Sequence, residues 1–75
     1  MMNKLYYVES IDRWILCLGI SGGITAEQSI KLRSSFCKFN HIDPNKLIIV
    51  AGEFECVGAQ DKSAMLNRFV KARGK

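Results

Sequence analysis

The stretch that decides the fold is WILCLGISGGITAEQ, residues 14–28. Its first part, Trp14 to Ile20, is apolar on both alternating faces, which predicts a strand that is buried on both sides. Ser21-Gly22-Gly23 predicts the turn that ends this strand, because paired glycines reach positive φ without steric cost. Thr25 then marks the start of a helix.

The helix expected after this turn follows Thr25 and ends at Asn40. Gln28, three residues after Thr25, completes a capping box. On a helical wheel the apolar side chains gather on one half: Ala26, Ile30, Leu32, Phe36, Cys37 and Phe39. Asn40 is expected at the left-handed position after the helix, and Asp43-Pro44-Asn45 prevents its continuation. The pattern therefore predicts an amphipathic helix packed on a sheet.

Further strands are expected at Leu5–Val8 and Lys46–Val50, which are rich in β-branched and aromatic residues. The polar segment Glu9 to Asp12 has hairpin length, so the first two strands should be antiparallel neighbours. Glu53–Val57 alternates acidic and apolar residues, which predicts a fourth strand or a bulged continuation of the third. A last helix is expected at Asp61–Arg73. Its buried arc should hold Met65, Leu66, Phe69, Val70 and Ala72.

The order ββαβ(β)α predicts a small two-layer α+β sandwich, a mixed sheet with two helices, with a three-layer α/β/α arrangement as the alternative. The strands carry apolar side chains on both faces, as Leu5 and Tyr7 against Tyr6 and Val8 show. If both helices cover one face, the other is an open apolar surface, which a soluble monomer rarely tolerates. We therefore expect a second subunit or a partner protein to cover the sheet, most simply in a homodimer.

Composition limits the classes of protein that the chain can belong to. Its 75 residues make one small domain, 1–75, and its 48% hydrophobic content is that of a folded chain. No apolar run approaches the roughly 20 residues that span a membrane, and Leu5 to Ser10 is too polar for the core of a signal peptide. A cytoplasmic location is expected, with no membrane partner.

Three cysteines, Cys17, Cys37 and Cys56, each lie within an apolar pattern. Buried reduced thiols are the expected state, because free cysteine is among the most buried residue types. The spacing of Cys37 and His41 also suits metal ligation across a helical turn, with the other two cysteines completing a set. No C-x-x-C pair occurs in the chain, so we expect neither a metal nor another cofactor.

The turn contains Gly19-Ile20-Ser21-Gly22-Gly23, which matches the G-x-S-x-G pattern of a nucleophile elbow. A hydrolase of that type needs an acid and then a histidine later in the chain, and His41 lies at the far end of the helix. The same glycines could cradle a phosphate at the helix N-terminus, although the lysine of a P-loop is missing. We expect a plain glycine turn and no enzyme.

The net charge of +4 lies entirely in the last fifteen residues. Residues 1–60 hold six basic and six acidic side chains, whereas residues 61–75 hold five basic side chains against Asp61. We expect an anionic surface to be contacted by Arg68, Lys71, Arg73 and Lys75. Arg33 lies inside the apolar half of the first helix, which indicates either a snorkelling side chain or an arginine at an interface.

These features favour a non-catalytic interaction protein that binds a larger protein assembly and regulates or inhibits it. Its partner should present an acidic surface to the basic C-terminal residues. The alternative is a small nucleic-acid-binding protein, for RNA or DNA, which the isoelectric point of about 9.2 supports. With at most four or five phosphates neutralised, such binding would be weak and salt-dependent.

Overall fold

The computed structural model describes residues 3–19, 23–52 and 57–73. In chain order the elements are β1 (Lys4–Val8), the 3-10 helix η1 (Glu9–Ile11), β2 (Arg13–Leu18), α1 (Ala26–Asn40), the 3-10 helix η2 (Pro44–Lys46), β3 (Leu47–Ala51), β4 (Gln60–Asp61) and α2 (Ser63–Arg73). The strands form one sheet in the order β3-β2-β1-β4.

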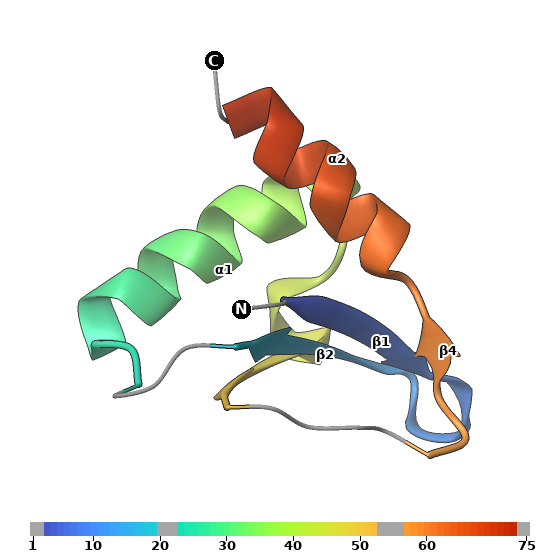
Figure 1. Ribbon diagram of the computed structural model, residues 1–75. Coiled ribbons are helices and arrows are strands. Elements are labelled where there is room, and N and C mark those ends of the chain that lie inside the picture. The colour runs from blue at the N-terminus through green and yellow to red at the C-terminus, as the bar shows by residue number, and fades with distance from the viewer. Residues whose placement is uncertain (1–2, 20–22, 53–56, 74–75) are drawn as a thin grey trace.

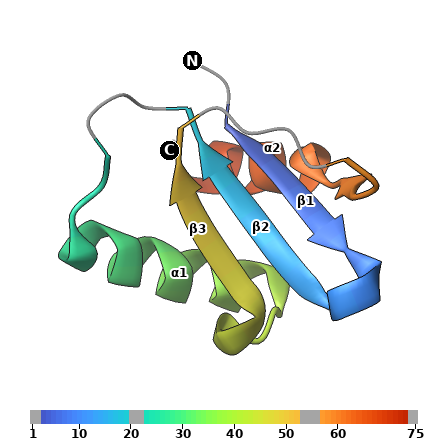
Figure 2. The ribbon, with the colours of Figure 1, turned by 90° about the horizontal axis from the view of Figure 1, so that it is seen from below.

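Both helices lie on the same face of the sheet (Figure 1; Figure 2). β1 pairs antiparallel with β2 and with β4, while β3 pairs parallel with β2 after the α1 crossover. α1 packs over β3, and α2 packs over β1. The predicted two-layer α+β sandwich with a mixed sheet and two helices is therefore confirmed, and the three-layer alternative is not the arrangement found.

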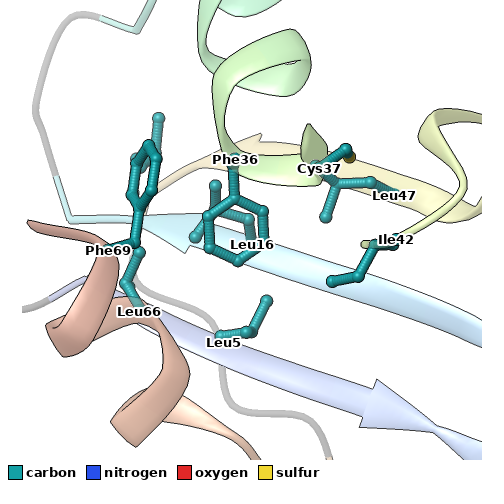
Figure 3. Packing of buried hydrophobic residues seen from close by; sticks show 9 residues of the cluster. Leu5, Leu16, Phe36, Cys37, Ile42, Leu47, Leu66 and Phe69 are labelled. Atoms are coloured by element: carbon teal, nitrogen blue, oxygen red, sulfur yellow. The ribbon is translucent and has the colours of Figure 1, made fainter. Parts of the chain in front are cut away.

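The core lies between the helices and the sheet (Figure 3). Leu5, Leu16, Phe36 and Leu47 are fully buried there. Leu5 of β1 is paired with Leu16 of β2, so the two side chains stand side by side on the helix face. The rings of Phe36 in α1 and Phe69 in α2 meet edge to face. Their centroids are 5.2 Å apart and their planes are inclined at 84°, a geometry that aromatic pairs prefer. This aromatic contact joins the two helices.

The ends of α1 follow local chemistry closely. The Thr25 hydroxyl accepts a hydrogen bond from the Gln28 main chain at 3.1 Å, and the Gln28 side chain accepts one from the Thr25 main chain at 3.1 Å, so the capping box is confirmed. The prediction that Asn40 takes the left-handed position is wrong. His41 does so, with φ of 55°, because the Asn40 amide donates to the Phe36 carbonyl and stays in the helix.

The last strand differs from the sequence prediction. β4 is Gln60–Asp61, although the sequence predicts Asp61 as the first residue of the last helix, and it pairs with Tyr6 and Tyr7 of β1. α2 begins at Ser63 instead of Asp61, whose carboxylate accepts the Ser63 N–H at 2.9 Å. The predicted strand at 53–57 falls mostly on residues 53–56, which lie outside the described residues, and Val57 is in a turn.

The helices bury narrower stripes than the wheel indicated. In α1, Phe36 and Cys37 are buried and Leu32 is half-buried, but Ala26, Ile30 and Phe39 are exposed. In α2, Leu66 and Phe69 are buried, whereas the Val70 side chain is 52% exposed and Ala72 is exposed. A small sheet with one two-residue edge strand offers little surface, so each helix covers it with one row of side chains.

The face of the sheet opposite the helices is only partly exposed. Tyr6 and Cys17 point to this face by the alternation of the strands, and both are buried. Ile15 and Val50 on the same face are half-buried, and Ile48 in the edge strand β3 is 42% exposed. The open apolar surface is therefore smaller than the sequence predicted, and it lies toward β3.

Candidate functional site

The basic end of α2 is the part of the predicted site that faces solvent. Arg68 and Lys71 are both exposed on the outer side of the helix. Ion pairs within the described residues join Lys31 to Glu27 and Lys46 to Asp12, and neither pair involves Arg68 or Lys71. Among the described residues, Arg68 and Lys71 therefore remain available to an anionic surface, as the exposed Lys38 on α1 also does.

The structure describes less of the other two residues of the predicted basic end, Arg73 and Lys75. Arg73 is the last residue of α2, and its side chain is outside the described part of the chain, as is the whole of Lys75. Arg73 follows Lys71 in the last turn of α2, at the negative end of the helix dipole. Their part in binding stays a prediction.

Arg33 belongs to α1 and has partners inside the protein. It is half-buried on α1, and its guanidinium donates hydrogen bonds to the main-chain carbonyls of Pro44, at 2.9 Å, and Leu47. The structure thus gives Arg33 a role in holding α1 to the start of β3. The sequence offered snorkelling or an interface as its two explanations, and a part for Arg33 in binding a partner stays a prediction beside these contacts.

A groove opens between the two helices on the same face as the core. Leu16 and Leu18 of β2 lie beneath it, buried in the core, and its walls come from α1 and α2. We call it the helix groove, and its apolar lining is Leu16, Leu18, Leu32, Leu66, Phe69 and Val70, with Asn3 at the rim. It has a volume of about 430 Å³. The sequence did not predict this groove, because its lining residues were all assigned to a closed core.

A second hollow, of about 410 Å³, lies on the other flank of α1 beside η2. Its lining includes Ile30, Arg33, Cys37, Lys38 and Ile42. Ile30 is the most exposed of these apolar side chains, at 67%. The hollow is partly occupied by the Arg33 contacts described above, so it is less open to a ligand than its apolar composition indicates.

Known proteins give no guide to this site. No protein-family model, curated protein or solved structure matches the chain. Within the described residues, neither helix is long and apolar enough to cross a membrane.

The cysteines do not assemble a metal site in the described part of the chain. Cys17 and Cys37 are buried, as expected, and Cys56 lies outside the described residues. Cys17 points to the face of the sheet away from the helices, whereas Cys37 belongs to α1, so the sheet separates them. Burial raises the pKa of the Cys37 thiol, although the nearby Arg33 charge opposes the effect. A thiol in this state is a poor nucleophile.

The glycine turn before α1 is described only in its last residue. Gly23 has φ of 78°, as a tight turn requires, but Ser21 and Gly22 of the G-x-S-x-G match lie outside the described residues. Gly23 and Thr25 are exposed. The Thr25 hydroxyl already accepts the Gln28 N–H, so the capping box uses part of the donor set that a phosphate would need.

A polar cluster that the sequence did not indicate joins the β1–β2 turn to η2. The Tyr7 hydroxyl donates to Asp12 Oδ1 at 2.6 Å, and Lys46 Nζ forms an ion pair with Asp12 Oδ2. The ring of Tyr7 packs on Trp14 with centroids 4.7 Å apart. The contacts with Lys46 and Tyr7 lower the pKa of Asp12, and the same contact with Asp12 raises the pKa of Tyr7. The groups satisfy one another, which makes the cluster a structural tie.

Proposed function

We propose that this protein is a non-catalytic interaction module that binds a larger protein through an acidic surface on that partner and regulates or inhibits it. The observation that carries the proposal is the pair of exposed cations on α2, Arg68 and Lys71, neither of which forms an ion pair with an acidic side chain among the described residues. Charges of this kind mainly speed association and select partners. The cytoplasmic location expected from the sequence is part of the same proposal.

We also propose that the protein forms a homodimer. Apolar side chains on the face away from the helices, Ile48 above all, would be covered if two copies met through the β3 side of the sheet. A symmetric pair would leave both copies of the basic end of α2 free for the partner, because the helices lie on the opposite face (Figure 1).

The test is affinity purification of the tagged protein from its native host, with and without nuclease treatment. The variant Arg68→Ser/Lys71→Ser/Arg73→Ser/Lys75→Ser should keep the fold and capture its protein partner at least about tenfold less well at low salt. The difference should close as salt rises. Equal capture by the variant and the wild type at low salt would refute the proposal.

Two double variants, each of which removes two positive charges, test whether the loss of partner capture arises on α2. Arg68→Ser/Lys71→Ser removes two exposed cations from α2, and Lys31→Ser/Lys38→Ser removes two from α1. Only the first should weaken capture. If capture depends on nucleic acid and disappears after nuclease treatment, the protein is a nucleic-acid binder and the protein-partner proposal fails.

A further inference from the structure

We propose that the hollow beside η2 binds a small organic acid, a monocarboxylate with a compact, branched apolar body. We call this site the α1–η2 hollow, and its lining includes Ile30, Arg33, Ser34, Lys38 and Pro44. In the bound state the carboxylate accepts hydrogen bonds from Arg33 and lies near Lys38, while the apolar body packs on Ile30. This binding does not involve the protein partner, so the inference goes beyond the proposed function.

One flank of α1 and the 3-10 helix η2 form the walls of the hollow. Ile30, Ser34 and Lys38 follow one another at i, i+4 and i+8 along α1, so they share one face of the helix. The Ile30 side chain is 67% exposed, and Ser34 and Lys38 are exposed as well. Pro44, also exposed, belongs to the lining from η2. The hollow is thus open to solvent, unlike the helix groove, most of whose lining is buried.

The Arg33 guanidinium has donors left over after its contacts with the main chain. Its Nη1 atom donates to the carbonyls of Pro44 and Leu47. Among the described residues, Nε and Nη2 have no hydrogen-bond partner. No buried side-chain nitrogen in that part of the chain lacks a partner, so these two atoms are open to solvent. Their N–H groups form one edge of the planar guanidinium, and a carboxylate accepts hydrogen bonds from such an edge with both of its oxygens.

The charge around the hollow is positive. Among the described residues, its lining holds two cations, Arg33 and Lys38, and no acidic side chain. Neither cation forms an ion pair with another described residue. Burial raises the pKa of the Cys37 thiol, which lines the hollow. Of the two charges that also act on this pKa, Arg33 lowers it more than Asp43 raises it. An anion is therefore attracted to this side of the molecule.

The size and composition of the hollow favour a small molecule with an apolar part. Apart from Ser34, the rest of the lining is apolar, with Ile30, Cys37, Ile42 and Pro44. The volume of about 410 Å³ falls within the range of ligand pockets, about 300–1,000 Å³, which combine apolar walls with a few polar groups that fix orientation. A stable protein interface needs about 800 Å² on each partner, and a single hollow covers only part of such an area. An inorganic anion would leave the apolar walls uncovered.

The experiment compares three small molecules: isocaproate, which is a branched monocarboxylate, its neutral amide isocaproamide, and acetate. Titrations of the wild-type protein, followed by ¹⁵N–¹H spectra, should show saturable shifts at Ile30, Ser34 and Cys37 with isocaproate at millimolar concentration. The amide and acetate should each bind at least about tenfold more weakly, because one lacks the charge and the other lacks the apolar body. Absent saturation with isocaproate, equal binding by the amide or acetate, or shifts centred on the helix groove or on α2 would overturn the inference.

Two matched pairs of variants locate the bound acid. Lys38→Met should weaken isocaproate binding at least about threefold, whereas Lys31→Met, which removes a cation of α1 outside the lining, should change it by less than about 1.5-fold. Ile30→Ser should weaken binding at least about threefold. Its control is Val70→Ser on α2, where the apolar side chain is also partly exposed, and binding should change by less than about 1.5-fold. Equal effects within either pair would show that the acid binds elsewhere.

Arg33→Lys tests the contact between the guanidinium edge and the carboxylate. Lysine keeps the charge but has no planar edge, so isocaproate should bind at least about tenfold more weakly. A thermal melt checks that this variant is folded, since its main-chain contacts also change, and if it is unfolded the Lys38 and Ile30 pairs decide. Asp43→Asn keeps the cap on η2 and removes the opposing charge, so isocaproate should bind more tightly. Undiminished binding by a folded Arg33→Lys, or no gain from Asp43→Asn, would contradict the inference.

Discussion

Arg33 of α1 donates a hydrogen bond to the main-chain carbonyl of Leu47, the first residue of β3. β3 is an edge strand, and an edge carbonyl without a partner is a place where other chains can add. The Leu47 N–H donates in turn to the Pro44 carbonyl, which Arg33 also contacts. Both main-chain groups of Leu47 are thereby satisfied within the protein, and the edge is closed at its start.

Replacing Arg33 should therefore cost stability. Arg33→Met keeps most of the apolar stem but leaves the Pro44 and Leu47 carbonyls without a charged donor, so the free energy of unfolding should fall by about 1.5–3 kcal/mol. Urea denaturation measures this change in the free energy of unfolding. The control is Lys38→Met, an exposed cation on the same helix, which should change stability by less than about 0.5 kcal/mol. Equal stabilities of the two variants would show that the Arg33 contacts contribute nothing, and would favour an interface role.

The role of Arg33 marks the limit of what the helical wheel could predict. The wheel placed Arg33 on the apolar half of α1, where its side chain is half-buried, because side-chain direction follows from helical geometry alone. Its partners, Pro44 and Leu47, come from η2 and β3, whose position against α1 depends on the packing of the whole chain. Local pattern indicated that Arg33 was unusual, and only tertiary structure shows what it contacts.

A substitution at Gly23 tests the turn that ends the β2–α1 connection. Gly23 has φ of 78°, and an added Cβ would meet nothing within 4 Å, so the cost comes from backbone conformation alone. Gly23→Val should lower the free energy of unfolding by about 1–2 kcal/mol, because L-residues disfavour the left-handed region. Gly23→Asn should cost less, since asparagine tolerates this region. A valine variant that melts at the wild-type temperature would contradict the requirement for glycine.

Elements with strong local signals were predicted well, and elements that depend on distant pairing were not. The capping box at Thr25 and the apolar run of β2 are local; the capping box is where it was expected, and β2 covers Trp14 to Leu18 of the expected strand. β4 has only Gln60 and Asp61, which carry no strand signal and pair because β1 lies beside them. The helix groove was missed for a similar reason, since its existence depends on the distance between α1 and α2.

A homodimer should be detected by light scattering coupled to size exclusion. The expected mass is twice the 8.5 kDa of one chain at tens of micromolar protein. Ile48→Lys places a charge on the exposed apolar part of the sheet and should yield the monomer, because an unpaired charge buried at an interface is costly. The matched control Val57→Lys changes a fully exposed residue in a turn and should leave the dimer intact. A wild-type monomer would end the proposal of self-association.

The ion pair of Asp12 should make part of the stability depend on pH. Hydrogen bonds from Lys46 and Tyr7 hold the pKa of Asp12 below its ordinary value. A carboxylate with a lowered pKa in the folded protein stabilises the fold above its unfolded pKa, about 3.9, and this stabilisation disappears as pH falls through the folded value. Asp12→Asn removes the charge and keeps the backbone, because asparagine tolerates the left-handed conformation that Asp12 adopts at φ of 51°.

The melting temperature of wild type should therefore exceed that of Asp12→Asn at pH 7, and the difference should shrink below about pH 4 as the wild-type carboxylate is protonated. High salt should reduce the difference at pH 7, since the pair with Lys46 is exposed to solvent. Glu9→Gln provides a control with the same loss of charge in the neighbouring turn, where Glu9 Oε2 accepts only a 3.3 Å hydrogen bond from the neutral Gln60 amide. An Asp12→Asn variant whose melting temperature follows that of wild type from pH 7 to pH 3 would show that the pair with Lys46 does not stabilise the fold.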